Sequence, residues 1–280
     1  MFLRCHTASV WQLCKQEPPD TFGATEQMRW RNTMSALLQN IQKYWTKRAD
    51  SYAFGQFTDD NENRWMKIVL REFPEGKGLK VLDIGTGPGF FAINLAKRGY
   101  EVTAVDYTPA MLEEAKRNAG AYRDSIRFMQ MDAQKLTFSD ETFDVVISRN
   151  LTWNLENPQK AYKEWRRVLK KDGVMLNFDA GWYEYLYDEE KAKQFKQDRE
   201  NVERAGCFDY NGYEDADKME EISRSLILSK VKRPQADLQM MLEAGFTKFY
   251  VDTEIWKETL DEEEKVNYAS TPGFMLKGIR

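Results

Sequence analysis

The chain has 280 residues, with 41 Lys and Arg against 45 Asp and Glu and a formal net charge of −4. A chain of this length can bury a full hydrophobic core without disulfides or metals. Its balanced charge provides no basic stripe for nucleic acid, and no run approaches the roughly 20 apolar residues needed to cross a bilayer.

The N-terminal part of the sequence changes character at Met34. Residues 1–33 contain two adjacent prolines and no steady apolar period, so we expect a loosely ordered extension there. From Met34 onward the apolar residues recur at helical spacing. We therefore predict one domain over residues 34–280, which begins with helices over residues 34–73.

After residue 79 the sequence alternates short β-branched runs with helical patterns. Strands that alternate with helices at this spacing are typical of a parallel sheet. Asn157 is a suitable N-cap for one of these helices, because its side chain can accept a hydrogen bond from a free backbone N–H and a proline follows it. The expected strands are 79–84, 101–106, 126–131, 143–148 and 174–179, and the expected helices are 90–98, 109–119 and 158–170.

The rhythm is interrupted over residues 182–232, a charged, tyrosine-rich and mainly helical stretch that we interpret as an inserted cap. A helix over 235–244 follows, and strands over 246–253 and 274–279 are expected to form an antiparallel pair. The predicted fold is therefore α/β and Rossmann-like. It has a seven-stranded, mostly parallel sheet with helices on both faces, and a helical cap insertion.

A glycine-rich turn, VLDIGTGPGFF over residues 81–91, runs from the first of these strands into a helix. Glycines can adopt positive φ and let a ligand approach the backbone closely. The start of the helix presents unpaired N–H groups. The next strand ends in Asp106, where Rossmann-type folds place an acid for ribose hydroxyls. The pattern predicts a site for a nucleotide-like ligand.

The spacing of the turn separates two nucleotide classes. A dinucleotide fingerprint reads G-x-G-x-x-G, but here Gly85, Gly87 and Gly89 give G-x-G-x-G, and Phe90 stands where the third glycine should be. Asp83 precedes the turn; its carboxylate can accept hydrogen bonds from an amino acid's ammonium but would repel a pyrophosphate. This chemistry favours S-adenosylmethionine over NAD. No Gly-Lys-Ser or Gly-Lys-Thr follows, which excludes a P-loop.

These residues resemble the class I S-adenosylmethionine-dependent methyltransferases, most closely the small-molecule branch that includes the ubiquinone and menaquinone biosynthesis enzymes. The resemblance covers roughly residues 44–179. It implies a cofactor site in which a loop holds the methionine part, Asp106 the ribose hydroxyls, and a lid helix the methionine end. The residues implied are Asp83, Gly85, Thr86, Gly87 and Gly89 in the loop, Asp106 and Tyr107 after the second strand, Asp132 and Ala133 by the adenine, Arg149 and Asn150 near the sulfonium, and Tyr44, Arg48 and Tyr52 on the lid.

The expected reaction is an in-line displacement in which an acceptor attacks the sulfonium methyl group. The only histidine, His6, lies in the predicted extension, so Asp179 at the end of the fifth strand, or a Tyr or Lys of the cap, is the candidate base. Arg149 is a second candidate catalytic residue. Trp153, Trp182 and Tyr183 either bind the acceptor or pack in the core.

We expect a small-molecule acceptor with a nitrogen, sulfur, or acidic oxygen or carbon nucleophile, since these need little help from a base. A protein or peptide acceptor, and a non-catalytic S-adenosylmethionine-binding module, remain alternatives. Cys5, Cys14 and Cys207 form no Cys-x-x-Cys pair, which favours a reducing, cytoplasmic setting and predicts no metal. We expect no nucleic-acid or membrane partner, and a monomer or homodimer.

Overall fold

The computed structural model describes residues 24–52, 57–74, 76, 78–213 and 215–280. The predictions that concern His6, Cys5 and Cys14 lie outside these residues. Within the described ranges, no helix combines the length and apolar character needed to cross a membrane.

A seven-stranded sheet forms the centre of the molecule, in the order β3-β2-β1-β4-β5-β7-β6. The first five strands are parallel, and β7 runs antiparallel between β5 and β6. The predicted seven-stranded, mostly parallel sheet is confirmed. Its strands are β1 Lys80–Ile84, β2 Glu101–Asp106, β3 Ile126–Gln130, β4 Phe143–Arg149, β5 Leu169–Asp179, β6 Lys248–Asp252 and β7 Phe274–Ile279.

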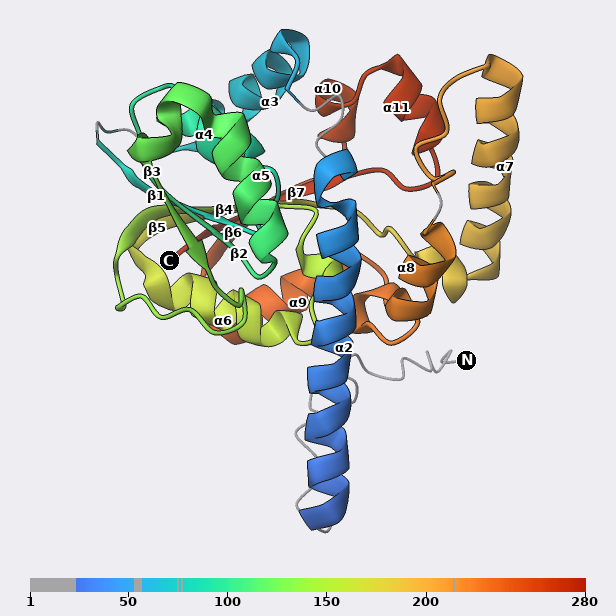
Figure 1. Cartoon of the computed structure of the whole chain (residues 1–280), viewed down its shortest axis with the longest axis horizontal. Helices are drawn as coiled ribbons and strands as arrows, with labels where there is room; N and C mark the ends of the chain where they lie inside the picture. Colours follow the sequence, from blue (N-terminus) through green and yellow to red (C-terminus); the bar gives the residue numbers. More distant parts are fainter. Residues whose placement is uncertain (1–23, 53–56, 75, 77, 214) are drawn as a thin grey trace, which may run out of the picture.

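Helices cover both faces of this sheet, as predicted (Figure 1). Side chains alternate between the faces along each strand: in β1, Val81 packs into the core on the side of α3 and α4, whereas Leu82 and Ile84 pack into the core on the side of α6 and α9. The helices flanking the sheet are α3 Asp59–Glu72, α4 Phe90–Ala96, α5 Pro109–Ala119, α6 Pro158–Val168 and α9 Gln235–Ala244.

The ends of α6 and α9 show why the sequence starts and stops helices there. The Asn157 side chain accepts a hydrogen bond from the backbone N–H of Lys160 at 2.9 Å, which confirms the predicted cap. Helix α6 ends before residue 170, because Leu169 already pairs with Phe143 in the sheet. Gly245 closes α9 with φ of 93°, in the left-handed region that glycine adopts without strain.

Two regions differ from the expectation. Helix α2 spans Ala24–Tyr52, so it begins before Met34 and takes in the last part of the predicted extension. Between the final two strands lie α10 Trp256–Thr259 and α11 Glu262–Asn267, which were not predicted. Helix α11 begins with a capping box formed by Asp261 and Glu264, a signal that its sequence carries.

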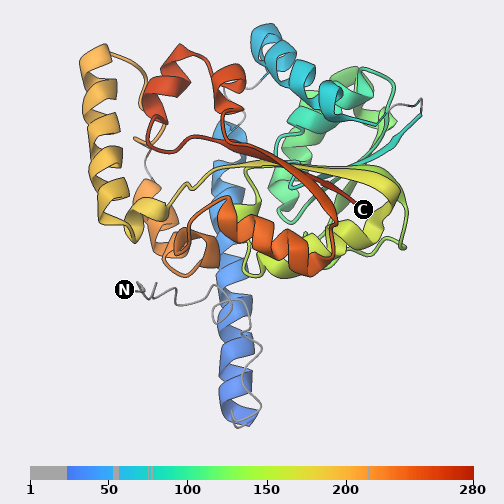
Figure 2. The same ribbon diagram turned by 180° about the vertical axis from the view of Figure 1, so that it is seen from behind.

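The inserted stretch is helical, as expected. It forms η3 Glu184–Leu186, α7 Glu189–Ala205, α8 Ala216–Ser223 and η4 Ile227–Ser229. Figures 1 and 2 show α7, α8 and α11 gathered at one side of the sheet, with α2 standing between them and the helices above β1 and β2. Side chains of α2 line both of the cavities described below.

Candidate functional site

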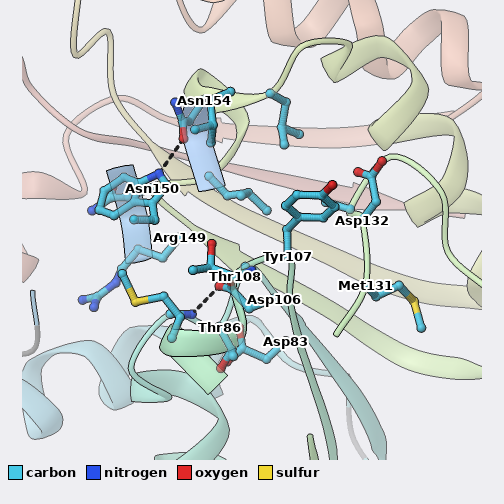
Figure 3. A pocket seen from close by; sticks show the side chains of 18 of the residues that line it. Asp83, Thr86, Asp106, Tyr107, Thr108, Met131, Asp132, Arg149, Asn150 and Asn154 are labelled. Carbon is cyan, nitrogen blue, oxygen red and sulfur yellow. Dashed lines mark hydrogen bonds between the residues drawn. The ribbon is translucent and has the colours of Figure 1, made fainter. Parts of the chain in front are cut away.

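One cavity lies where the strand order reverses, between β1 and β4 at the carboxyl ends of the parallel strands (Figure 3), and we call it the first cavity. Open α/β sheets bind their ligands in this crevice. The cavity measures about 950 Å³ when its open mouth is included, which is within the usual range of roughly 300–1,000 Å³ for small-molecule sites.

The glycine turn forms the floor of this cavity. Gly85 and Gly87 have φ of 66° and 52°, which side-chain-bearing residues rarely adopt. A Cβ on Gly85 would lie 2.7 Å from the Leu151 side chain. A Cβ on Gly87 would have, among the residues that the structure describes, only the Tyr52 ring within 4 Å, at 3.9 Å. The Leu151 side chain thus leaves no room for a Cβ at Gly85. At Gly87 the corresponding space belongs to the cavity.

Asp83 holds the turn and the following helix together. Its carboxylate accepts hydrogen bonds from the Thr86 hydroxyl at 2.7 Å and from the backbone N–H of Ala92 at 3.0 Å. Ala92 lies in the first turn of α4, where the N–H groups have no partner within the helix. Burial of Asp83 raises the pKa of its carboxyl to about 6. A cationic ligand would favour the ionised form.

Asp106 braces the turn from the end of β2. Its two carboxylate oxygens accept hydrogen bonds from the backbone N–H groups of Gly87 at 2.9 Å and Thr108 at 2.8 Å. Burial raises the pKa of this carboxyl to about 6 as well. Each carboxylate oxygen has further lone-pair capacity, so Asp106 can still accept ligand hydroxyls.

The opposite end of the cavity is an apolar slot with one acid at its edge. Met131 and Ala133 are buried there. Asp132 accepts hydrogen bonds from the backbone and side-chain N–H groups of Gln134 at 2.9 and 3.0 Å through the same oxygen, Oδ1. Figure 3 shows Met131 and Asp132 across the cavity from Arg149 and Asn150. A flat ring with an exocyclic amino group suits such a slot.

Arg149 ends β4 on the other side of the cavity. Its guanidinium carbon lies 4.3 Å from the centre of the Phe90 ring and 5.0 Å from that of Trp65, a cation–π arrangement. Burial lowers its pKa from the ordinary value. Arg149 therefore presents a fixed cation, with which a ligand carboxylate can pair.

Helix α2 closes the cavity from above. Trp45 donates its indole N–H to the side-chain oxygen of Asn154 at 2.7 Å, and Gln42 donates to the backbone carbonyl of Tyr107 at 3.2 Å. Trp45 and Tyr52, on the same side of the helix, both line the cavity.

A second cavity lies on the other side of these two aromatic residues, between α2, the segment 182–232 and α11. It measures about 1160 Å³ with its mouth, and Trp45, Tyr52 and Asn150 line both cavities. The rest of its lining is dominated by aromatic rings. These belong to Tyr44, Trp153, Trp182, Tyr183, Tyr185, Phe195, Tyr210, Tyr213 and Tyr268.

The structure places most of the predicted cofactor residues on the first cavity. These are Asp83, Gly85, Thr86, Gly87, Asp106, Tyr107, Asp132, Ala133, Arg149, Asn150 and Tyr52.

Three predicted cofactor residues lie elsewhere. Tyr44 and Arg48 line the second cavity. Gly89 lies beneath α4 and α5, where a Cβ would approach Ala115 to 3.1 Å.

The predicted acceptor residues Trp153, Trp182 and Tyr183 all line the second cavity. Trp153 is also a core residue, 7% exposed, and its ring lies 5.1 Å from that of Tyr183. Trp153 and Tyr183 thus pack against each other and also line the cavity.

Asp179 lines neither cavity. Its side chain is fully buried and pairs with the guanidinium of Arg233 at 3.2 Å. It also accepts hydrogen bonds from the backbone N–H of Trp153 at 3.0 Å, the indole N–H of Trp182 at 3.0 Å, and the Thr152 hydroxyl. This placement does not favour the predicted role of Asp179 as a base.

Arg233 and Asp237 complete the buried cluster, and sequence reasoning missed both. Their side chains, one helical turn apart, pair at 2.7 Å with no exposed surface, and Tyr162 donates its hydroxyl to Asp237 at 2.8 Å. The spacing of four residues was visible, but nothing in the sequence marked the pair as buried. Among the described residues, no three His, Cys, Asp or Glu side chains are grouped to hold a metal ion.

Comparison with known proteins finds a family model that matches the central part of the chain. Residues 82–177 match the family model described as a methyltransferase domain. The demethylmenaquinone methyltransferase of Staphylococcus aureus (strain MRSA252) is 32% identical over 143 residues, which are 50% of this chain and 57% of that protein. The chain thus matches little more than half the length of this relative.

Solved structures share the fold. Phosphoethanolamine N-methyltransferase 2 of Haemonchus contortus, solved in complex with S-adenosyl-L-methionine, superposes with a TM-score of 0.56 at 19% identity, over 83% of this chain and 59% of that one. A methyltransferase of Thermotoga maritima superposes with a TM-score of 0.55 at 19% identity, over 85% and 99% of the two chains.

Proposed function

We propose that this chain, whose residues 82–177 match a methyltransferase domain, is a class I S-adenosylmethionine-dependent methyltransferase that transfers the methyl group to a small molecule held in the second cavity. The observation that carries the proposal is the meeting of two cavities at Trp45, Tyr52 and Asn150. One cavity has the groups that suit the cofactor, and the other opens where the methyl group would be presented.

The first cavity fits the parts of the cofactor. Asp83 would receive the ammonium group, Arg149 the carboxylate and Asp106 the ribose hydroxyls, while Asp132 and the apolar slot would take the adenine. The open space at Gly87 supports this fit, because a Cβ there would lie 3.9 Å from the Tyr52 ring and within 4 Å of no other described residue. Bound S-adenosylmethionine would supply an electrophilic methyl group on a cationic sulfur.

The chain's own contribution is then to position the acceptor and exclude water. Trp45 and Tyr52 form the wall between the cavities, and Asn150 has a positive φ of 54° that its backbone hydrogen bond to Phe178, at 2.8 Å, helps to hold. We propose Asp179 as a positioning residue, since its hydrogen bonds fix Trp153 and Trp182 in the wall of the second cavity.

An acceptor with little need for a base suits this cavity. Asp179 is enclosed, and the remaining acid deep in the lining, Glu220, accepts the Tyr185 hydroxyl at 2.7 Å. A nitrogen, sulfur or already ionised oxygen or carbon nucleophile fits these conditions. The segment 182–232 would serve as the acceptor-binding cap.

A peptide acceptor is the second candidate, and a module that binds the cofactor without turnover is the third. The aromatic cavity under the cap favours a compact molecule over a chain. We further propose a cytoplasmic monomer or homodimer with no nucleic-acid partner, on the basis of the cysteine pattern and the balanced charge.

A turnover assay tests the proposal. The full chain is incubated with S-adenosylmethionine and a panel of small metabolites or, separately, peptides, and S-adenosylhomocysteine is measured. We expect product with at least one small molecule, loss of at least 10-fold in Asp106→Asn, and native rates in Asp124→Asn, which alters an exposed acid. Product with peptides alone, or cofactor binding without product, would support the second or third candidate instead.

A further inference from the structure

The second cavity contains Arg48, a cationic side chain that forms no ion pair with any acid in the described part of the chain. We propose that Arg48, together with the hydroxyl groups around it, forms a subsite for an oxygen anion, such as a carboxylate, on a planar aromatic acceptor. This inference rests on the proposed function, because it assigns chemistry to the acceptor cavity.

Arg48 projects from α2 and lies flat against a ring. Its guanidinium carbon is 4.3 Å from the centre of the Tyr213 ring. Its Nε is buried and, among the described residues, has no hydrogen-bond partner. Guanidinium groups favour planar, two-point pairing with carboxylates, and a buried donor without an acceptor is unfavourable. An oxygen anion in the cavity would satisfy this group.

The other charged residues of the lining are occupied or peripheral. Arg199 pairs with Asp209 and donates to Asn267. Glu220 accepts the Tyr185 hydroxyl, and Asp217 is an exposed acid in the first turn of α8. Arg48 is therefore the charged residue with which a ligand in this cavity can pair without breaking an existing interaction.

Tyrosine hydroxyls surround the same place. Tyr213 interacts with the hydroxyl groups of Tyr44 and Tyr183, and all three residues line the cavity with Arg48. Burial raises the pKa of Tyr44 and of Tyr183 well above the ordinary value. The phenols therefore stay protonated at neutral pH and can donate hydrogen bonds to an anion.

The position of Arg48 on α2 also determines what size of acceptor would fit. Trp45, Arg48 and Tyr52 are three and four residues apart, so they share one face of the helix, with neighbours about 5–6 Å apart at Cβ. Trp45 and Tyr52 mark the point where the cavities meet. The anion would thus lie about one aromatic ring away from the atom that is methylated. The surrounding rings would stack on the acceptor's flat faces.

Three naphthalene probes that differ in the charge of one substituent test the subsite. Binding of 2-naphthoate, 2-naphthamide and 2-naphthylmethylammonium to the full chain, saturated with S-adenosylhomocysteine, is measured by calorimetry. The native protein should bind naphthoate about 10-fold more tightly than naphthamide, the scale of a charge-assisted hydrogen bond. In Arg48→Met this preference should fall below about 2-fold. Lys43→Met, which alters an exposed residue of the same helix, should keep the native preference for naphthoate.

Several outcomes would overturn the subsite. These are no measurable binding of naphthoate, equal binding of naphthoate and naphthamide by the native protein, a preference that persists in Arg48→Met, or tightest binding of the ammonium probe. The titration with S-adenosylhomocysteine that precedes each experiment reports on the proposed function separately. If that titration succeeds and the carboxylate preference is absent, the anion subsite alone is wrong.

Discussion

Asp83 and Asp106 are buried carboxylates that hold the glycine turn through backbone and hydroxyl donors before any ligand arrives. The pKa of each is about 6 in the folded chain, above the ordinary 3.8. Because the folded pKa is the higher one, the ligand-free chain loses stability through these groups as the pH rises from about 4 to about 6. At neutral pH both carboxylates are ionised, and a cationic ligand can offset the unfavourable free energy of burying their charge.

A pH dependence of cofactor binding follows from these two groups. An ammonium group and ribose hydroxyls bind the ionised carboxylates, so affinity should fall as the pH drops through about 6. We expect S-adenosylhomocysteine to bind about 10-fold more weakly at pH 5.5 than at pH 7.5, as measured by calorimetry. The double variant Asp83→Asn, Asp106→Asn should bind weakly at both pH values. Tighter binding by the native chain at pH 5.5 would contradict this reading.

Gly85 and Gly87 share a left-handed backbone but differ in what surrounds them. An alanine at either position pays a similar backbone strain of about 1–2 kcal/mol. Gly85→Ala must also push aside Leu151, 2.7 Å from the new Cβ, so it should lose about 1–3 kcal/mol more in free energy of unfolding. Gly87→Ala should mainly weaken cofactor binding.

Urea denaturation and calorimetry on the two alanine variants separate these effects, and each variant is the control for the other. Equal losses of stability would show that the Leu151 contact is not limiting. Unchanged cofactor affinity in Gly87→Ala would show that the open space at this glycine is not used.

At the scale of elements, the carboxyl end of β5, the turn after β4 and the start of α9 are joined by one buried ionic cluster. Arg233 donates to Asp179, to Asp237 and to the backbone carbonyl of Ala180, at 2.7–3.2 Å. The cluster therefore connects the helix that follows the cap with the turn that carries Trp153.

Arg233→Met tests how much this buried ionic cluster contributes to the stability of the fold. The change leaves two buried carboxylates without their cation, which typically costs about 3–5 kcal/mol. We expect a loss of that size in the free energy of unfolding, measured in urea. Arg123→Met, at an exposed position, should stay within about 0.5 kcal/mol of the native protein. Arg233→Lys should recover part of the loss, and a loss no larger than that of Arg123→Met would contradict the assigned role.

At the scale of the whole molecule, the parallel half of the sheet and the glycine turn could be predicted because local signals determine them. The strands ending in Ile84 and Asp106 are apolar and β-branched, and the turn residues follow at once. The second cavity could not be predicted. Its walls come from α2, the segment 182–232 and α11, whose juxtaposition depends on long-range packing.

The burial of single charged residues was equally hidden from the sequence. Asp179 stands at a strand end, where acids often face a ligand, yet Arg233 lies 54 positions later and encloses it. Arg48 was expected beside the cofactor, because its helix resembles the lid helix of class I methyltransferases, but it lines the neighbouring cavity. A helix that separates two cavities can present consecutive turns to different ligands, and periodicity alone cannot assign them.

The central claim is that a carboxylate-braced turn at the end of β1 binds a sulfonium amino acid and not a pyrophosphate. Calorimetry of the full chain at pH 7.5 with S-adenosylhomocysteine, and separately with NAD, tests it most directly. We predict one S-adenosylhomocysteine bound per chain, binding weakened at least 10-fold in Asp106→Asn, and no heat with NAD. Binding of NAD that is tighter than binding of S-adenosylhomocysteine would contradict the claim.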